Sequence, residues 1–207
     1  MALEGVGLVI GYPGHPDLLS GLSMAVAPGE RVALRAPSGT GKTTLARVLA
    51  GYIAPRRGHV LVDGSPLAGT RGPRAVQLLP QHPEQGFDPR LRLARSLAEG
   101  AAVDAAEHDA LRERFGVRGE WLARFPHELS GGELMRLCMV RALASRPRYL
   151  IADEATAMLD AVTQAELWRV LCDLQAERGL GILFVSHSPA LVARLATRCI
   201  DLQGINL

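Results

Sequence analysis

The chain has 207 residues, 48% of them hydrophobic, and its 23 Lys and Arg against 21 Asp and Glu leave a formal net charge of +2. This length suits one sizeable core and excludes two independent enzymes, and the balanced charge gives no electrostatic reason to expect nucleic acid or an anionic membrane surface as the main partner. No stretch approaches the roughly 20 apolar residues of a membrane-spanning helix, and the first residues lack the pattern of a secretory signal, so we expect a cytosolic chain.

Three short β-prone runs open the chain, each bounded by Gly, Pro or an Asp-Gly pair. They cover residues 8–10, 32–34 and 60–62. We expect these runs to form an N-terminal sheet around a loop. That loop follows the second run and reads Ala-Pro-Ser-Gly-Thr-Gly-Lys-Thr at 36–43. A helix is predicted from Lys42 to Ala50, and Gly51 marks its end.

This strand, loop and helix have the chemistry to bind a nucleoside triphosphate. Successive backbone N–H groups can point into one concavity, Lys42 can reach the outer phosphates, and the Thr43 hydroxyl can bind Mg²⁺. The predicted nucleotide contacts are Ser38, Gly39, Thr40, Gly41, Lys42, Thr43 and Thr44. The alternative is a glycine-rich turn with an incidental lysine. Ala36 stands where such loops often start with Gly, which predicts a negative φ at this position.

The middle of the chain changes character after Gln85. An Ala-, Glu- and Arg-rich stretch from Arg90 to about Arg124 is predicted to be helical, with Phe125-Pro126 ending it. The segment from Ser130 to Glu133 has the Ser-x-x-Glu form of a capping box ahead of an apolar helical stripe. We therefore expect an appended helical lobe, with a helix starting at Ser130.

The last third of the chain alternates strands and helices. Unbroken apolar runs at 149–152 and 182–185 are typical of strands that are buried on both faces of a parallel sheet. Helices are predicted for about 161–178 and from Ser188-Pro189 onward. This alternation predicts a doubly wound α/β fold.

Two carboxylates, Asp153 and Glu154, directly follow the apolar run at 149–152. Ligand sites in open parallel sheets gather at this end of the strands. Asp153 is predicted to hold Mg²⁺ through water, and Glu154 to orient and deprotonate the water that attacks the terminal phosphorus. The alternative is an Asp-Glu pair that only begins a turn or caps a helix.

The order of these motifs resembles the nucleotide-binding subunits of ATP-binding cassette (ABC) transporters, from Tyr12 to about Leu202. The sequence Leu-Ser-Gly-Gly-Glu at 129–133 is similar to that family's signature. The resemblance implies an α/β fold of the P-loop NTPase type: a RecA-like, mostly parallel sheet core with an N-terminal antiparallel β subdomain and an inserted helical subdomain. It implies one domain, 1–207, with the core at 1–81 and 145–207 and the helical subdomain at about 82–144.

The same resemblance assigns further roles. Gln81 corresponds to the family's Q-loop glutamine, His187 to its switch histidine, and Tyr12 to the aromatic that stacks on adenine. The implied catalytic residues are Glu154, His187, Gln81 and Lys42; the implied Mg²⁺ ligands are Thr43, Gln81 and Asp153. From the residues alone, Tyr12 could be a turn aromatic, and Gln81 and His187 could be ordinary strand ends.

In the family, two cassettes close head to tail over two ATP molecules. Ser130, Gly131 and Gly132 would therefore bind the ATP of the opposite subunit, and residues 157–160 correspond to the D-loop. Two departures are Ala155, where proline is common, and Ser188, where aspartate is common. Because serine is also a good helix cap, we expect Ser188 to keep the local geometry.

Segments 81–90, 125–132 and 153–160 resemble the ATPase subunits of nickel and peptide importers. The implied function is ATP hydrolysis, with ATP and Mg²⁺ as cofactors, that powers import of nickel, a metal chelate or a peptide at the cytoplasmic face of the cell membrane. The implied partners are a second ABC ATPase subunit, identical or different, transmembrane permease subunits and, indirectly, an external solute-binding protein, with no nucleic acid. A soluble ATPase acting on nucleic acid or ribosomes and a noncatalytic regulatory cassette remain alternatives.

Cysteines and histidines give no metal or disulfide pattern. Cys138, Cys172 and Cys199 lie in apolar helical or strand patterns, so we expect each to be a buried, reduced thiol. The six histidines show no convincing ligand spacing.

Overall fold

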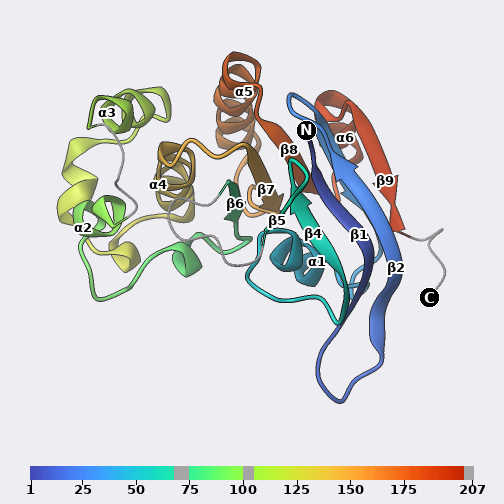
Figure 1. Cartoon of the computed structure of the whole chain (residues 1–207). Helices are drawn as coiled ribbons and strands as arrows, with labels where there is room; N and C mark the ends of the chain where they lie inside the picture. Colours follow the sequence, from blue (N-terminus) through green and yellow to red (C-terminus); the bar gives the residue numbers. More distant parts are fainter. Residues whose placement is uncertain (68–74, 100–104, 203–207) are drawn as a thin grey trace.

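A computed structural model describes residues 1–67, 75–99 and 105–202. Its elements form a central parallel sheet, an antiparallel sheet on one side, helices on the other, and a group of short helices beside them (Figure 1). Helix α1 (Lys42–Leu49) contacts both sheets. In the part of the chain that the structure describes, no helix is both long and apolar enough to span a bilayer.

The central sheet has the strand order β6-β7-β8-β3-β9, and every neighbouring pair is parallel. Its strands are β3 (Arg31–Arg35), β6 (Val76–Leu79), β7 (Tyr149–Asp153), β8 (Gly181–Val185) and β9 (Arg198–Asp201). All five residues of β7 and of β8 are buried, as their unbroken apolar runs predict.

Alternate residues of these strands serve two different cores. Leu150, Ile182 and Phe184 belong to the core that also contains apolar residues of α4 (Gly131–Ala144), α5 (Ala161–Arg178) and α6 (Pro189–Leu195). Ile151, Leu183 and Val185 belong to the core shared with α1 and the antiparallel sheet. Because successive side chains of a strand point to opposite faces, both faces of the parallel sheet are packed against a core, and the sheet is the middle of three layers.

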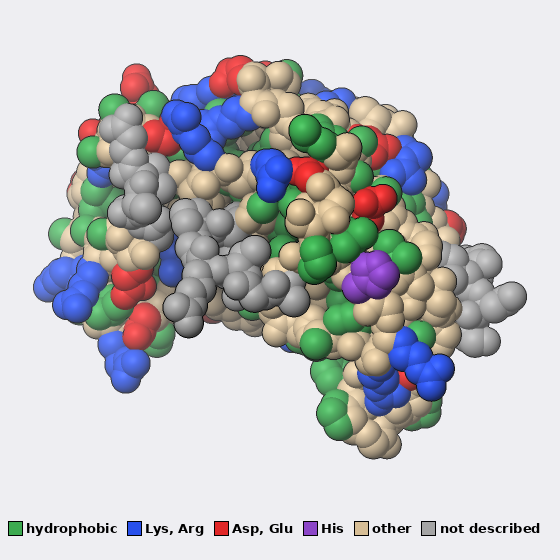
Figure 2. Space-filling model, in the orientation of Figure 1, with side chains coloured by type: hydrophobic (Ala, Val, Ile, Leu, Met, Phe, Trp, Pro, Cys, Tyr) green, Lys and Arg blue, Asp and Glu red, His purple; other side chains and the backbone are tan. Residues whose placement is uncertain are grey.

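The antiparallel sheet has the strand order β2-β1-β4-β5. Its strands are β1 (Leu3–Gly11), β2 (Asp17–Val26), β4 (Arg57–Val62) and β5 (Ser65–Pro66). The expectation that run 32–34 belongs to this N-terminal sheet is wrong, because it lies in β3 between β8 and β9. Basic side chains gather on the end of the antiparallel sheet that projects from the molecule (Figure 2).

The short helices lie between β6 and β7 in the chain. They are η1 (Pro83–Gly86), α2 (Leu93–Ala98), α3 (Ala105–Arg114), η2 (Gly119–Ala123) and η3 (Pro126–Glu128), and the longer α4 follows them. The expected helical stretch from Arg90 to Arg124 is not continuous: part of it, residues 100–104, lies outside the described residues, and Gly116, at φ +63°, lies between α3 and η2. A left-handed glycine ends a helix in this way.

The cysteine expectation holds only in part. Cys138 is buried, Cys172 is partly exposed and Cys199 is exposed. Cys199 lies on β9, the edge strand of the parallel sheet, where one side has no further strand to cover it.

Candidate active site

The glycine-rich loop connects β3 to α1, as predicted. Gly39 and Gly41 both have left-handed backbones, at φ +83° and φ +90°, which explains the need for glycine at these two positions. Gly41 is the residue that caps α1, and as a glycine it has no side chain to accept a hydrogen bond from the first turn of this helix. The N–H groups of that turn are therefore available to an anion. Ala36 is not among the described non-glycine residues with positive φ, as predicted.

Lys42 lies under this loop. Its side chain is buried, and its Nζ donates to the carbonyl oxygens of Ala36, at 2.9 Å, and Pro37, at 2.8 Å. The Thr40 hydroxyl donates to the same Pro37 carbonyl, at 2.7 Å. The loop is thus closed around the ammonium group, which brings one positive charge to the place where phosphate oxygens are expected.

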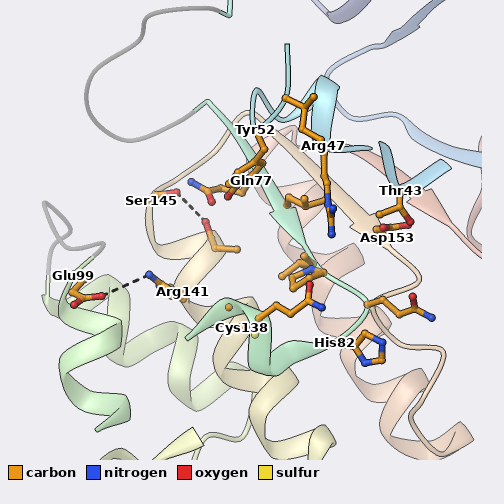
Figure 3. A pocket seen from close by; sticks show the side chains of 18 residues that line it. Thr43, Arg47, Tyr52, Gln77, His82, Glu99, Cys138, Arg141, Ser145 and Asp153 are labelled. Carbon is orange, nitrogen blue, oxygen red and sulfur yellow. Dashed lines mark hydrogen bonds and ion pairs between the residues drawn. The ribbon is translucent and has the colours of Figure 1, made fainter. Parts of the chain in front are cut away.

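Asp153 is the last residue of β7 and lies beside Thr43, the second residue of α1 (Figure 3). Burial raises the pKa of the Asp153 carboxyl, a hydrogen bond from Thr43 opposes this rise, and the charge of Glu154 adds to it. A hydroxyl and a buried carboxylate with incomplete charge compensation form an oxygen donor set of the kind that Mg²⁺ prefers. These residues therefore fit the predicted metal.

Glu154 lies between Gln81 and His187. Its Oε1 is 3.0 Å from His187 Nε2, and its Oε2 accepts from Gln81 Nε2 at 3.3 Å. Each of these three residues follows one of three neighbouring parallel strands: Gln81 follows β6, Glu154 follows β7 and His187 follows β8. The carboxyl ends of these strands lie at the same edge of the sheet, which brings the three side chains together. Glu154 itself has φ +50°, an unusual backbone for a non-glycine residue.

Tyr12 lies in the turn that joins β1 to β2, and it also reaches the first turn of α1, directly after the phosphate loop. Its hydroxyl is 3.1 Å from the Thr44 hydroxyl on α1, while 44% of the residue remains exposed. An aromatic ring that is partly exposed next to the predicted phosphate site has apolar surface available to a base.

A groove of about 1050 Å³ adjoins these residues (Figure 3). Thr43, Gln81 and Asp153 line it together with residues of β6. On the opposite side, α4 contributes Cys138 and Arg141. The groove therefore separates the sheet that carries the acidic pair from the short helices.

The predicted signature residues line a different recess of about 490 Å³. Ser130 caps α4: its Oγ accepts from the Glu133 backbone N–H at 3.3 Å, and Glu133 Oε2 accepts from the Ser130 N–H at 2.9 Å. The predicted capping box is thus confirmed. Gly131 and Gly132 lie at the start of this 14-residue helix, together with Arg118 and Arg136 in the recess wall. The helix N-terminus and Arg118 favour an anionic ligand, whereas Arg136 is already paired with Glu166, and the Glu133 and Asp160 carboxylates also line the recess.

A family model described as ABC transporter matches residues 19–157, more than half of the chain. The chain belongs to the ABC transporter family. The nickel import ATP-binding protein NikE of Rhodospirillum rubrum is 37% identical over 94% of this cassette and 76% of its own length. The glutathione import ATP-binding protein GsiA of Salmonella typhimurium is 38% identical over 86% of the cassette, which spans only 31% of that protein. The predicted likeness to nickel and peptide importers is confirmed.

A solved structure described as the ATP binding subunit of an ABC transporter superposes on the cassette with a TM-score of 0.83. It is 28% identical and covers 97% of this chain and 85% of its own. The predicted fold, a P-loop NTPase with an N-terminal antiparallel sheet and inserted helices, is confirmed.

The segment 157–160 of the cassette, which the resemblance equates with the D-loop, is held by contacts that sequence reasoning missed. The hydroxyl of the buried Thr156 accepts from Trp168 Nε1 and from Gln164 Nε2, both at 3.0 Å. Asp160 caps α5 by accepting from the Val162 N–H at 3.0 Å. Only the Asp160 cap has a local sequence signal, because the Thr156 contacts join residues eight and twelve positions apart.

Arg118 and Arg136 are the other site residues that the sequence did not reveal. Arg118 lies in the stretch read only for its helix propensity, and Arg136 lies on the helix predicted from the capping box, where no spacing marks it. Their position beside the signature residues depends on how η2 and α4 pack.

Proposed function

We propose that the chain binds and hydrolyses ATP and thereby powers import through partner permeases. The observation that carries this proposal is the carboxylate of Glu154, held by Gln81 and His187 next to the Asp153 and Thr43 pair. A glycine-rich loop with an enclosed lysine, and a strand end with two carboxylates in different surroundings, are the parts that phosphoryl transfer to water requires.

Glu154 acts as the general base in this proposal. Its carboxylate accepts a proton from the attacking water, and His187, 3.0 Å away, keeps that carboxylate oriented. Lys42 and the N–H groups of Ser38–Thr44 hold the phosphates, and Tyr12 stacks on adenine. Thr43, Gln81 and Asp153 would hold Mg²⁺, which would neutralise charge on the phosphate oxygens.

The signature residues serve a second cassette. Ser130, Gly131 and Gly132 line a recess apart from the groove that Thr43 and Asp153 line, so one chain offers two half-sites. A head-to-tail pair joins each phosphate loop to the partner's signature and completes two sites at once. ATP binding then favours the closed pair, and hydrolysis releases it.

The importer assignment is supported by the names of the relatives, which import nickel and glutathione. We infer a place at the cytoplasmic face of the membrane, with permease subunits and an external solute-binding protein as further partners. We also infer one domain, with its core at 1–81 and 145–207 and a helical subdomain at about 82–144. A noncatalytic cassette is disfavoured, since Gln81, Glu154 and His187 all meet.

The test uses two variants, Glu154→Gln and Ser130→Ala, purified alone and mixed. Removing a general base lowers turnover by about 10²- to 10⁴-fold, so Glu154→Gln is expected to bind ATP and hydrolyse almost none. In an equal mixture, half of the pairs combine one chain of each kind, and each such pair has one intact site and one doubly defective site. Activity is then expected to recover to about a quarter of the wild-type value. Unchanged turnover in Glu154→Gln contradicts the catalytic role, and a mixture no better than its components contradicts the shared site.

A further inference from the structure

The turn that carries Tyr12 has little internal support. It runs from Tyr12 to Pro16, between the last β1–β2 pair, Gly11 with Asp17. Two of its five residues are prolines, which have no N–H to donate. The backbone bond within it runs from the His15 N–H to the Tyr12 carbonyl, at 3.0 Å. The conformation of this turn therefore depends on donors from elsewhere.

Arg56 supplies those donors. Its guanidinium donates to the Tyr12 and His15 carbonyl oxygens, the second at 2.8 Å, and forms an ion pair with Asp17. The Arg56 backbone N–H donates to Val9 on β1 at 2.8 Å, which anchors the arginine to the sheet. One planar group thus holds both ends of the turn, a geometry that suits a guanidinium fork and not a lysine.

The Arg56 guanidinium lies so close to Gly11 that this position has little room for a side chain. A Cβ added there would lie 3.0 Å from Arg56 Cζ and 3.0 Å from the Pro16 carbonyl oxygen. Glycine at the end of β1 therefore leaves room for the arginine. Basic side chains are visible at this projecting end of the antiparallel sheet (Figure 2).

We propose that Arg56 is a positioning residue that holds the Tyr12 ring against the phosphate loop and so sets the affinity for the base of the nucleotide. This inference rests on the proposed function, in which Tyr12 contacts adenine. The link from Arg56 to the first turn of α1, which follows the phosphate loop, is short: Arg56 to the Tyr12 carbonyl, and the Tyr12 hydroxyl to Thr44. Arg56 contacts neither the phosphate loop nor the acidic pair in the described contacts, so it acts through Tyr12.

Calorimetric titration of ATP and of inorganic tripolyphosphate separates these roles. Base stacking on an aromatic residue is worth about 1–3 kcal/mol, so Tyr12→Ala is expected to weaken ATP binding by about tenfold or more. Arg56→Gln is expected to weaken ATP by about fivefold, because the ring is still present but no longer held. Tripolyphosphate affinity is expected to be unchanged in both. The matched control is Arg57→Gln, the same substitution one residue away at an exposed position, with no expected effect.

The double variant Arg56→Gln with Tyr12→Ala is expected to bind ATP no more weakly than Tyr12→Ala alone. Multiplied effects, an equal loss of tripolyphosphate, or unchanged ATP binding in Arg56→Gln would each overturn the inference. Should Arg56→Gln fold poorly, Asp17→Asn releases only the ion pair and is expected to weaken ATP selectively, to a smaller extent. A wild-type chain that binds no ATP refutes the proposed function itself, whereas ATP binding that ignores Arg56 refutes only this inference.

Discussion

Replacing Thr156 with valine is expected to destabilise the cassette by about 2 kcal/mol, because a buried donor loses its acceptor. Thr156 is 4% exposed, and its hydroxyl accepts from Trp168 Nε1, itself on a residue that is 4% exposed. Valine has nearly the same shape, so the loss comes from the unpaired indole N–H and not from a cavity. Gln164 keeps its bond to the Thr156 carbonyl, at 2.9 Å, and adds little to the cost.

The measurement is urea unfolding of a double-mutant cycle that combines Thr156→Val with Trp168→Phe. Trp168→Phe removes the donor, so Thr156→Val is then expected to cost about 1 kcal/mol less than it does in the wild type. Amide exchange should rise at Ala157 and Leu159, whose N–H groups donate to Glu154 and Thr156 carbonyls at 2.9 and 3.3 Å. A loss below about 0.5 kcal/mol, or strict additivity, would show that this hydroxyl does not hold the segment.

Two further predictions concern ion pairing and backbone space. Burial raises the pKa of Glu107, but the Arg146 hydrogen bond and the Arg178 charge outweigh it and leave this pKa below its usual range. The pairing therefore stabilises the fold at pH values above the ordinary glutamate pKa, and this stabilisation is lost as the pH falls through the lowered pKa of Glu107. In urea titrations, Glu107→Gln is expected to lower the free energy of unfolding by about 1 kcal/mol at neutral pH and not at all in strong acid. A difference between variant and wild type that stays the same at every pH would contradict this. Gly58→Ala would place a Cβ 2.4 Å from a β1 carbonyl oxygen at φ +79°, whereas Gly64→Ala, at φ +80°, meets nothing within 4 Å. Thermal unfolding is expected to show that Gly64→Ala lowers the free energy of unfolding by about 1 kcal/mol and Gly58→Ala by about 3 kcal/mol or more. Equal losses for the two variants would mean that the structure relaxes around the added Cβ at residue 58.

Features coded within a few consecutive residues could be predicted from the sequence. The apolar runs at 149–152 and 182–185 specify strands buried on both faces, and Ser130 with Glu133 specifies a cap, because each depends only on near neighbours. The assignment of run 32–34 to the wrong sheet has the opposite cause. A short apolar strand pairs equally well in either sheet, and only distant partners, β8 and β9, decide the choice.

The site could be predicted because its residues have local sequence signals, whereas the missed contacts depend on distant partners. Gln81, Glu154 and His187 each follow a strand, and parallel topology converts that local position into proximity. Arg56 has no such marker, because its contacts with the turn at 12–16 arise from the pairing of β1 with β4. An arginine between a proline and a second arginine carries no information about which carbonyl groups it will reach.

The backbone of Glu154 explains how two consecutive carboxylates face different partners. In a regular strand, neighbouring side chains point to opposite faces, and one of the two would enter the apolar core. Here β7 ends at Asp153, whose side chain faces Thr43, and the left-handed turn at Glu154 carries the second carboxylate out of the strand toward Gln81 and His187. A left-handed non-glycine residue costs about 1–2 kcal/mol. The hydrogen bonds of Glu154 and the buried strand before it offset that cost, so strain at this residue separates a predicted metal-binding carboxylate from a predicted proton acceptor.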